Sequence, residues 1–188
     1  RVYLAALLLS VGQVDKAETL LTAIAAGDRR TTALAEALRK LIAAVKGQVS
    51  SVVLDTRLAT AGLAESYYRQ SRGELSPSLA AATNAVFRAP QFGFGWARVA
   101  ELEFGFGRTK RALEAVERAL VLSPRNAEAF ALKGFLLSAQ NKIPQALEMF
   151  DQAIAQDGGL GNGWLGRGLC RLRQGDAELG RQDLLGAA

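Results

Sequence analysis

The chain has 188 residues, of which 49% are hydrophobic and 22% are charged, and its formal net charge is +5. This composition excludes a disordered tail and is typical of a folded protein. Basic residues are mixed with acidic ones along the sequence, so we expect no nucleic-acid partner. With one cysteine and no histidine, we expect neither an internal disulfide nor a zinc-type metal site.

The first two predicted helices form a hairpin over residues 1–29. An apolar run covers residues 2–11, and a glycine and an amphipathic segment at 14–26 follow it directly. A signal-peptide core is the alternative interpretation of the run, but no small-residue cleavage pattern follows it, so we interpret it as a helix. No apolar stretch approaches the roughly 20 uninterrupted residues of a membrane span, so none is predicted.

The next stretch, residues 30–58, is predicted to be an irregular or shortened unit. Leu34 and Leu38 are among the apolar residues that share one face of a helix expected over 30–47. Residues 47–55 are rich in β-branched side chains, which disfavours a second helix of full length.

From residue 59 onward the sequence repeats with a period of 34 residues. A large aromatic recurs at Trp96, Phe130 and Trp164, and a small residue follows each of them by four positions. The aromatic and the small residue then share one helix face, where the small residue admits a neighbouring helix. The small residues are Ala100, Gly134 and Gly168, and the positions repeated in the second helix are Ala112, Ala146 and Gly180, then Val116, Phe150 and Leu184, then Ala119, Ala153 and Ala187.

Turn residues separate the two helices of each repeat. They are Gly73, Gly107, Asn141 and Gly175. Pro77 and Pro144 fall in the first turn of a second helix, where a missing N–H is tolerated. The predicted helices cover residues 2–11, 14–26, 30–47, 55–72, 77–88, 93–106, 109–122, 127–140, 144–156, 161–174 and 177–187.

These spacings resemble the tetratricopeptide repeat, a pattern of aromatic, leucine, small, tyrosine, alanine and proline positions. The resemblance implies an all-α fold, a right-handed α-solenoid of stacked antiparallel hairpins with about 11 helices. The sequence departs from the pattern at Lys133 and Arg167, where leucine is usual, and at Glu103 and Arg171, where tyrosine is usual. In the weaker copy over residues 59–92, Gly62 replaces the first aromatic and Ala85 follows in register.

The predicted organisation is a single array over residues 1–188. Both ends of the sequence fall inside the repeat pattern, so we expect a piece of a longer, bacterial protein. The array divides into a hairpin at 1–29, the irregular unit at 30–58, a weak repeat at 59–92, repeats at 93–126 and 127–160, and an incomplete repeat at 161–188.

In this family the first helices of successive hairpins line a concave groove. The family's clamp for a peptide carboxylate uses lysine and asparagine, but these positions carry apolar or acidic residues such as Ala131 and Glu101. The resemblance therefore implies an apolar, aromatic-lined groove, and core packing or a flanking segment are the alternative explanations of its apolar residues. The candidate groove residues are Tyr67, Phe94, Arg98 at the edge, Glu101, Phe104, Phe135, Ser138, Asn162, Leu165, Leu169, Leu172 and Arg173.

No motif points to catalysis. Residues 161–166 fit the glycine pattern of a dinucleotide-binding turn, but no strand is predicted before them and the repeat accounts for their glycines. Cys170 has no histidine to act as its base, so we interpret it as core. Carboxylate pairs such as Glu114 and Glu117 have basic neighbours at helical spacing, as a solvated face would. We expect no enzyme activity, no cofactor and no metal.

The sequence leaves three functions open. The leading prediction is a non-catalytic scaffold that binds an apolar peptide or helix of a protein partner in its groove. The alternatives are a spacer or self-association segment of a larger envelope or secretion protein, with a homodimer as one form, and a regulatory array beside a catalytic domain. We expect a soluble protein, and the single cysteine leaves cytoplasm and periplasm equally open.

Overall fold

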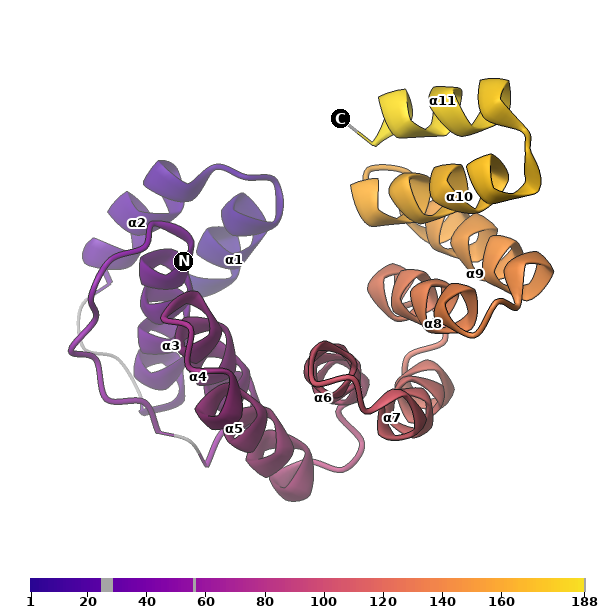
Figure 1. Cartoon of the computed structure of the whole chain (residues 1–188). Coiled ribbons are helices and arrows are strands. Elements are labelled where there is room, and N and C mark those ends of the chain that lie inside the picture. Colours follow the sequence, from indigo (N-terminus) through magenta and orange to yellow (C-terminus); the bar gives the residue numbers. More distant parts are fainter. Residues whose placement is uncertain (25–28, 56, 188) are drawn as a thin grey trace. The chain divides into compact units, whose positions relative to one another are not determined.

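The computed structural model describes residues 1–24, 29–55 and 57–187. Within them the chain has eleven helices and no strand, so the all-α class is confirmed (Figure 1). The helices form two compact units, Arg1–Pro90 and Gln91–Ala188. Helix ends differ most from the prediction at the second and fourth helices, which end at Thr22 and begin at Ala59, and residues 25 and 26 of the predicted second helix lie outside the described residues.

The first unit combines two hairpins with one long helix. Helices α1 and α2 form one hairpin, α4 and α5 form another, and α3 packs against α1, α2 and α4. The helices are α1 (Val2–Ser10), α2 (Val14–Thr22), α3 (Arg29–Val45), α4 (Ala59–Ser71) and α5 (Leu75–Arg88).

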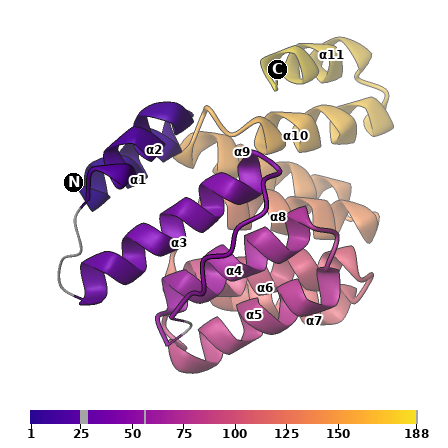
Figure 2. The same cartoon turned by 90° about the vertical axis from the view of Figure 1, so that its left-hand side faces the viewer.

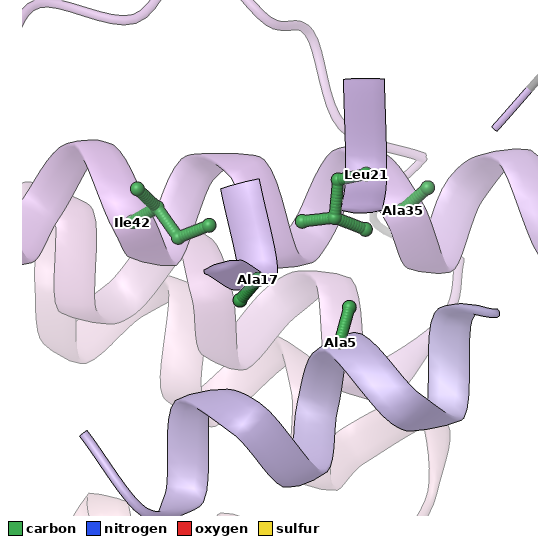
Figure 3. Close-up of a cluster of buried hydrophobic side chains, with 5 residues drawn as sticks. All are labelled: Ala5, Ala17, Leu21, Ala35 and Ile42. Carbon is green, nitrogen blue, oxygen red and sulfur yellow. The ribbon is translucent and has the colours of Figure 1, made fainter. Parts of the chain in front are cut away.

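The core of the first three helices is built mainly from small residues. Ala5, Ala17, Leu21, Ala35 and Ile42 are each at most 2% exposed, and Figure 3 shows these side chains meeting between α1, α2 and α3. Alanines let the helix backbones approach closely, while the leucine and the isoleucine fill the space that remains. Burial of this apolar surface, more than helix propensity, holds the short helices α1 and α2 in place.

An irregular segment follows α3 and lies along α3 and α4 (Figure 2). Lys40 of α3 is almost fully buried, and its ammonium donates a hydrogen bond of 2.8 Å to the carbonyl oxygen of Val52 and lies 2.6 Å from Glu65 Oε2. The backbone N–H of Ser50 donates to the Tyr68 hydroxyl at 2.9 Å. These polar contacts take the place of a second helix, because they satisfy backbone groups that a helix would pair internally.

The second unit consists of three hairpins. The first helices of the hairpins, α6, α8 and α10, contact one another in that order, so α8 lies between α6 and α10 (Figure 1). The helices are α6 (Gly93–Gly105), α7 (Thr109–Leu122), α8 (Ala127–Ala139), α9 (Ile143–Gln156), α10 (Gly161–Gln174) and α11 (Ala177–Gly186).

The turns inside the hairpins have a left-handed backbone, as the repeat register predicts. Gly73, Gly107 and Gly175 have φ values of 74°, 72° and 89°, and Asn141 has φ 61°. Glycine adopts this conformation without a steric penalty, and asparagine is among the side chains that tolerate it best. One backbone conformation therefore ends the first helix of each of these hairpins.

Phe150 of α9 fills a notch made by two glycines. Its side chain is fully buried, and its ring lies edge-on to Phe135 at a centroid distance of 5.0 Å. A Cβ added to Gly134 of α8 would lie 2.7 Å from the Phe150 ring, and one added to Gly166 of α10 would be closer still. The glycine run at the start of α10 therefore serves helix packing, and no strand precedes it in the described chain.

The last hairpin holds a buried ion-pair cluster. Asp183 of α11 has a side chain only 4% exposed, and its two oxygens accept hydrogen bonds of 2.9 and 2.7 Å from Arg167 and one of 2.8 Å from Arg171. Arg167 also reaches Asp151 of α9 at 2.7 Å and lies over the Trp164 ring at 4.7 Å. The hydrogen bonds to Asp183 raise the pKa of the Arg167 guanidinium, which keeps it charged inside the hairpin.

Candidate functional site

A row of three exposed leucines runs along α10. Leu165, Leu169 and Leu172 are 38%, 45% and 40% exposed, and their spacing of four and three residues places them on one helix face. We call these residues the leucine stripe. All three are predicted groove residues.

The buried sides of α10 carry small residues. Gly163, Gly166, Gly168 and Cys170 are buried against the neighbouring helices, and Cys170 is only 1% exposed, so its predicted place in the core is confirmed. An amphipathic helix usually buries its leucines and exposes polar residues. Helix α10 instead buries small residues and leaves its leucines partly exposed. Leu172 packs in part against Gly180 of α11, where an added Cβ would lie 2.8 Å from its Cγ, but about two fifths of each leucine still faces outward without a partner among the described residues of the second unit.

Arg173 ties the end of α10 to α8. Its guanidinium donates to the carbonyl oxygen of Ser138 at 3.2 Å and to Asn141 Oδ1 at 2.9 Å. The structure therefore brings together Ser138 and Arg173, two of the predicted site residues, beside the leucine stripe. Because these polar groups are already paired, they fix the position of the helix end and leave the apolar leucines as its main contact surface.

The predicted aromatic positions differ in exposure. Phe94 of α6 is 55% exposed, with its ring 6.3 Å from that of Phe92. Phe104 is half-buried, and Phe135 is half-buried against Phe150, so packing accounts for much of its surface. On α10, all three candidate leucines are exposed, and Asn162 at the start of the helix is exposed as well.

An acidic corner lies on α6 and α8. Arg98, predicted at the edge of the groove, is buried and donates a hydrogen bond of 2.8 Å to Glu101 Oε2. Glu128 at the start of α8 keeps contact with solvent, but nearby protein atoms remove part of its hydration. This desolvation raises the pKa of Glu128, the negative charges of Glu101 and Asp157 raise it further, and Arg98 partly opposes the shift.

The raised pKa of Glu128 predicts a pH-dependent stability. The folded protein binds this proton more tightly than the unfolded chain, so the contribution is complete below the usual pKa of 4.5 and is lost as pH rises through the raised value. We expect Glu128→Gln to raise the melting temperature at neutral pH, with a gain that shrinks in acid. Thermal scans across pH test this, with Glu148→Gln on the exposed face of α9 as control. An equal gain at all pH values would contradict the prediction.

The remaining predicted residue, Tyr67, belongs to the first unit. It lies on α4 and lines a pocket between α1, α3 and α4 together with Thr60 and Leu63. The sequence indicated Tyr67 through the repeat register, but it gave no sign that residues of α1 and α3 would complete a pocket there. Sequence reasoning missed them because the irregular unit breaks the register between these helices.

Neither a metal site nor a membrane-spanning helix is found in residues 1–24, 29–55 and 57–187. No group of three or more histidine, cysteine or carboxylate side chains lies close enough to hold a metal ion there. Over the same residues, every helix is too short or too polar to cross a bilayer.

Comparison with known proteins identifies the repeat type. The family model described as tetratricopeptide repeat matches residues 132–188. This range contains most of α8 and all of α9, α10 and α11, and so includes the leucine stripe. No curated protein sequence was found to match the chain.

Solved structures show the same fold over nearly the whole chain. MamA is 15% identical with a TM-score of 0.60, and the match covers 87% of this chain and 94% of MamA. YrrB, described as a TPR protein with an unusual peptide-binding site, is 18% identical with a TM-score of 0.55 and coverages of 99% and 82%. A chain of the APC/C hetero-tetramer Cut9–Hcn1 is 17% identical with a TM-score of 0.76 and coverages of 97% and 36%.

Proposed function

Because this chain carries tetratricopeptide repeats at residues 132–188 and has the fold of tetratricopeptide-repeat proteins, we propose that it is a non-catalytic interaction scaffold. Its second unit binds an apolar segment of a protein partner across α10 and the neighbouring first helices. The observation that carries this proposal is the leucine stripe, which is exposed while glycines occupy the buried face of the same helix.

The chemistry of the surface favours an apolar partner segment. Each leucine of the stripe has about two fifths of its surface exposed, so covering it completely contributes roughly 1 kcal/mol. Three leucines on one face offer a contact as long as two helical turns, which suits the apolar face of an amphipathic helix or an extended apolar segment. YrrB has this fold and a peptide-binding site, which supports a peptide as the kind of partner.

Peptide selection tests the proposal. Random peptides displayed on phage are selected on the intact chain, and their affinities for the chain and its variants are measured by calorimetry. We expect apolar consensus sequences, and we expect Leu165→Ser with Leu169→Ser to weaken binding about tenfold or more, since two covered leucines contribute over 1.4 kcal/mol. Val121→Ser on α7, which removes an exposed apolar side chain from a second helix, is the matched control.

Two outcomes would count against the proposal. Peptides that bind the double variant as tightly as the unchanged chain would show that the leucine stripe is not the binding surface. Sedimentation over a concentration series gives the other test. A stable dimer that the same two serines dissociate would favour self-association of the stripe over capture of a different partner.

A further inference from the structure

The pocket of the first unit has the form of an open bowl. Its volume is about 310 Å³, and helices α1, α3 and α4 form its walls. Its floor is made of the buried residues Ala37 and Ala64, and half-buried leucines such as Leu38 and Leu63 form its sides. Small floor residues between larger wall residues produce depth without distorting the helices.

The rim of the pocket is aromatic and exposed. Tyr3 on α1 is 83% exposed and Tyr67 on α4 is 36% exposed, and both residues contribute to the lining. Thr60 is also exposed and lies in the first turn of α4. The pocket is therefore continuous with solvent, so a group that enters it can remain attached to a larger molecule outside.

The lining selects for an apolar group. None of the residues that line the pocket is charged, and hydroxyls occur only on its two tyrosines and its threonine. Water in such a space finds few hydrogen-bond partners and is readily displaced by an apolar group. The volume is at the lower end of ligand pockets, which begin at about 300 Å³, and so suits one ring system better than an extended ligand.

We propose that this pocket binds a single aromatic side chain of a polypeptide partner, with tryptophan the best fit. The ring enters between α1 and α4, packs on the leucine walls and meets the two rim tyrosines, while the backbone of the partner stays outside. This inference goes beyond the function proposed above, because it concerns the other unit and does not depend on the leucine stripe.

Nuclear magnetic resonance titration of the intact chain tests the proposal. N-acetyltryptophanamide represents a tryptophan side chain within a polypeptide, N-acetylglutaminamide is the polar control, and free indole represents a small molecule. We expect saturable amide shifts on α1, α3 and α4 with the tryptophan compound and none with the glutamine compound. Ala6→Phe fills the pocket from α1 and should weaken binding of the tryptophan compound at least tenfold.

Further variants separate this proposal from that for the stripe. Thr60→Trp closes the mouth from an exposed position and gives a second test if Ala6→Phe does not fold. The variant with Leu165→Ser and Leu169→Ser should bind the tryptophan compound unchanged. If free indole bound saturably and N-acetyltryptophanamide did not, the pocket would be a site for free small molecules, and the proposal would be overturned. The proposal would also be overturned if the tryptophan compound gave no saturable shifts, or if it bound equally well to a folded variant whose pocket is filled.

Discussion

We expect Phe150→Ala to lower the free energy of unfolding by about 3–5 kcal/mol, the range for removing a buried phenylalanine. The ring is fully buried between two glycines and lies edge-on to Phe135. Neither glycine has a side chain that could move into the space left by the ring, so the cavity stays largely open. Urea unfolding followed by circular dichroism measures the loss by linear extrapolation.

Two comparisons show whether the stability loss of Phe150→Ala comes from the notch between the two glycines. Phe87→Ala removes a ring that is 83% exposed, so we expect a change within about 0.5 kcal/mol. Gly166→Ala places a methyl group against the Phe150 ring and is expected to destabilise by about 1–3 kcal/mol. Combined with Phe150→Ala, the same methyl group no longer meets the ring and should stabilise by up to about 1 kcal/mol, because alanine favours the helix over glycine. Additive losses in the double variant would mean that the two residues do not share the notch.

We expect Asp183→Ala to lower the free energy of unfolding by about 3–5 kcal/mol, because it leaves two arginines without their buried partner. Arg167 and Arg171 both donate hydrogen bonds to this carboxylate, whose side chain is 4% exposed. The loss comes from the uncompensated charges as well as from the missing contacts. Chemical unfolding with urea, which leaves ionic strength unchanged, is the appropriate measurement.

Asp151 provides the matched control for this prediction. It also binds Arg167, at 2.7 Å, but its side chain is 57% exposed. Solvent screens this pair, so Asp151→Asn should change stability by less than about 1 kcal/mol. Similar losses for the two aspartates would show that burial does not determine the strength of these pairs.

The repeat period was enough to predict the helical architecture. The small residues predicted at helix crossings do lie at close contacts, since a Cβ on Gly62 would be 2.9 Å from Ala85 Cβ and one on Gly168 would be 2.9 Å from the carbonyl oxygen of Gly180. Such positions are readable from sequence because each imposes a local steric requirement on one residue type. The boundaries of the individual repeats stay a prediction.

The charged departures from the repeat pattern could not be interpreted from sequence. Each finds a partner in the structure: Lys133 pairs with Glu117 at 2.8 Å, Glu103 pairs with Arg108 at 3.1 Å, and the two arginines of α10 share Asp183. A leucine position requires only burial, whereas a charged residue there requires an oppositely charged partner in reach. Which partner is in reach depends on how the two helices and the turn of a hairpin pack, and the repeat pattern, which lists residue types at fixed positions, does not contain that geometry.

The register indicated the helix faces of the candidate groove residues but not their exposure, and the groove itself stays a prediction. The register indicated Leu165, Leu169 and Leu172, and all three are exposed. It also indicated Arg98 as an edge residue, whereas the structure buries it. The repeat register specifies the helix face on which a residue lies. How deeply the residue is buried depends on the size of neighbouring side chains, which the family pattern does not fix.

The glycines of α10 also make its helix depend on its surroundings. The helix contains four glycines in fourteen residues. Relative to alanine, they make the free energy of helix formation of the isolated segment about 4 kcal/mol less favourable. The helical conformation of the segment therefore depends on its packing against α8, α9 and α11. Any molecule that covers the leucine stripe would bind only the ordered form, so partner binding and ordering of the last hairpin are thermodynamically linked.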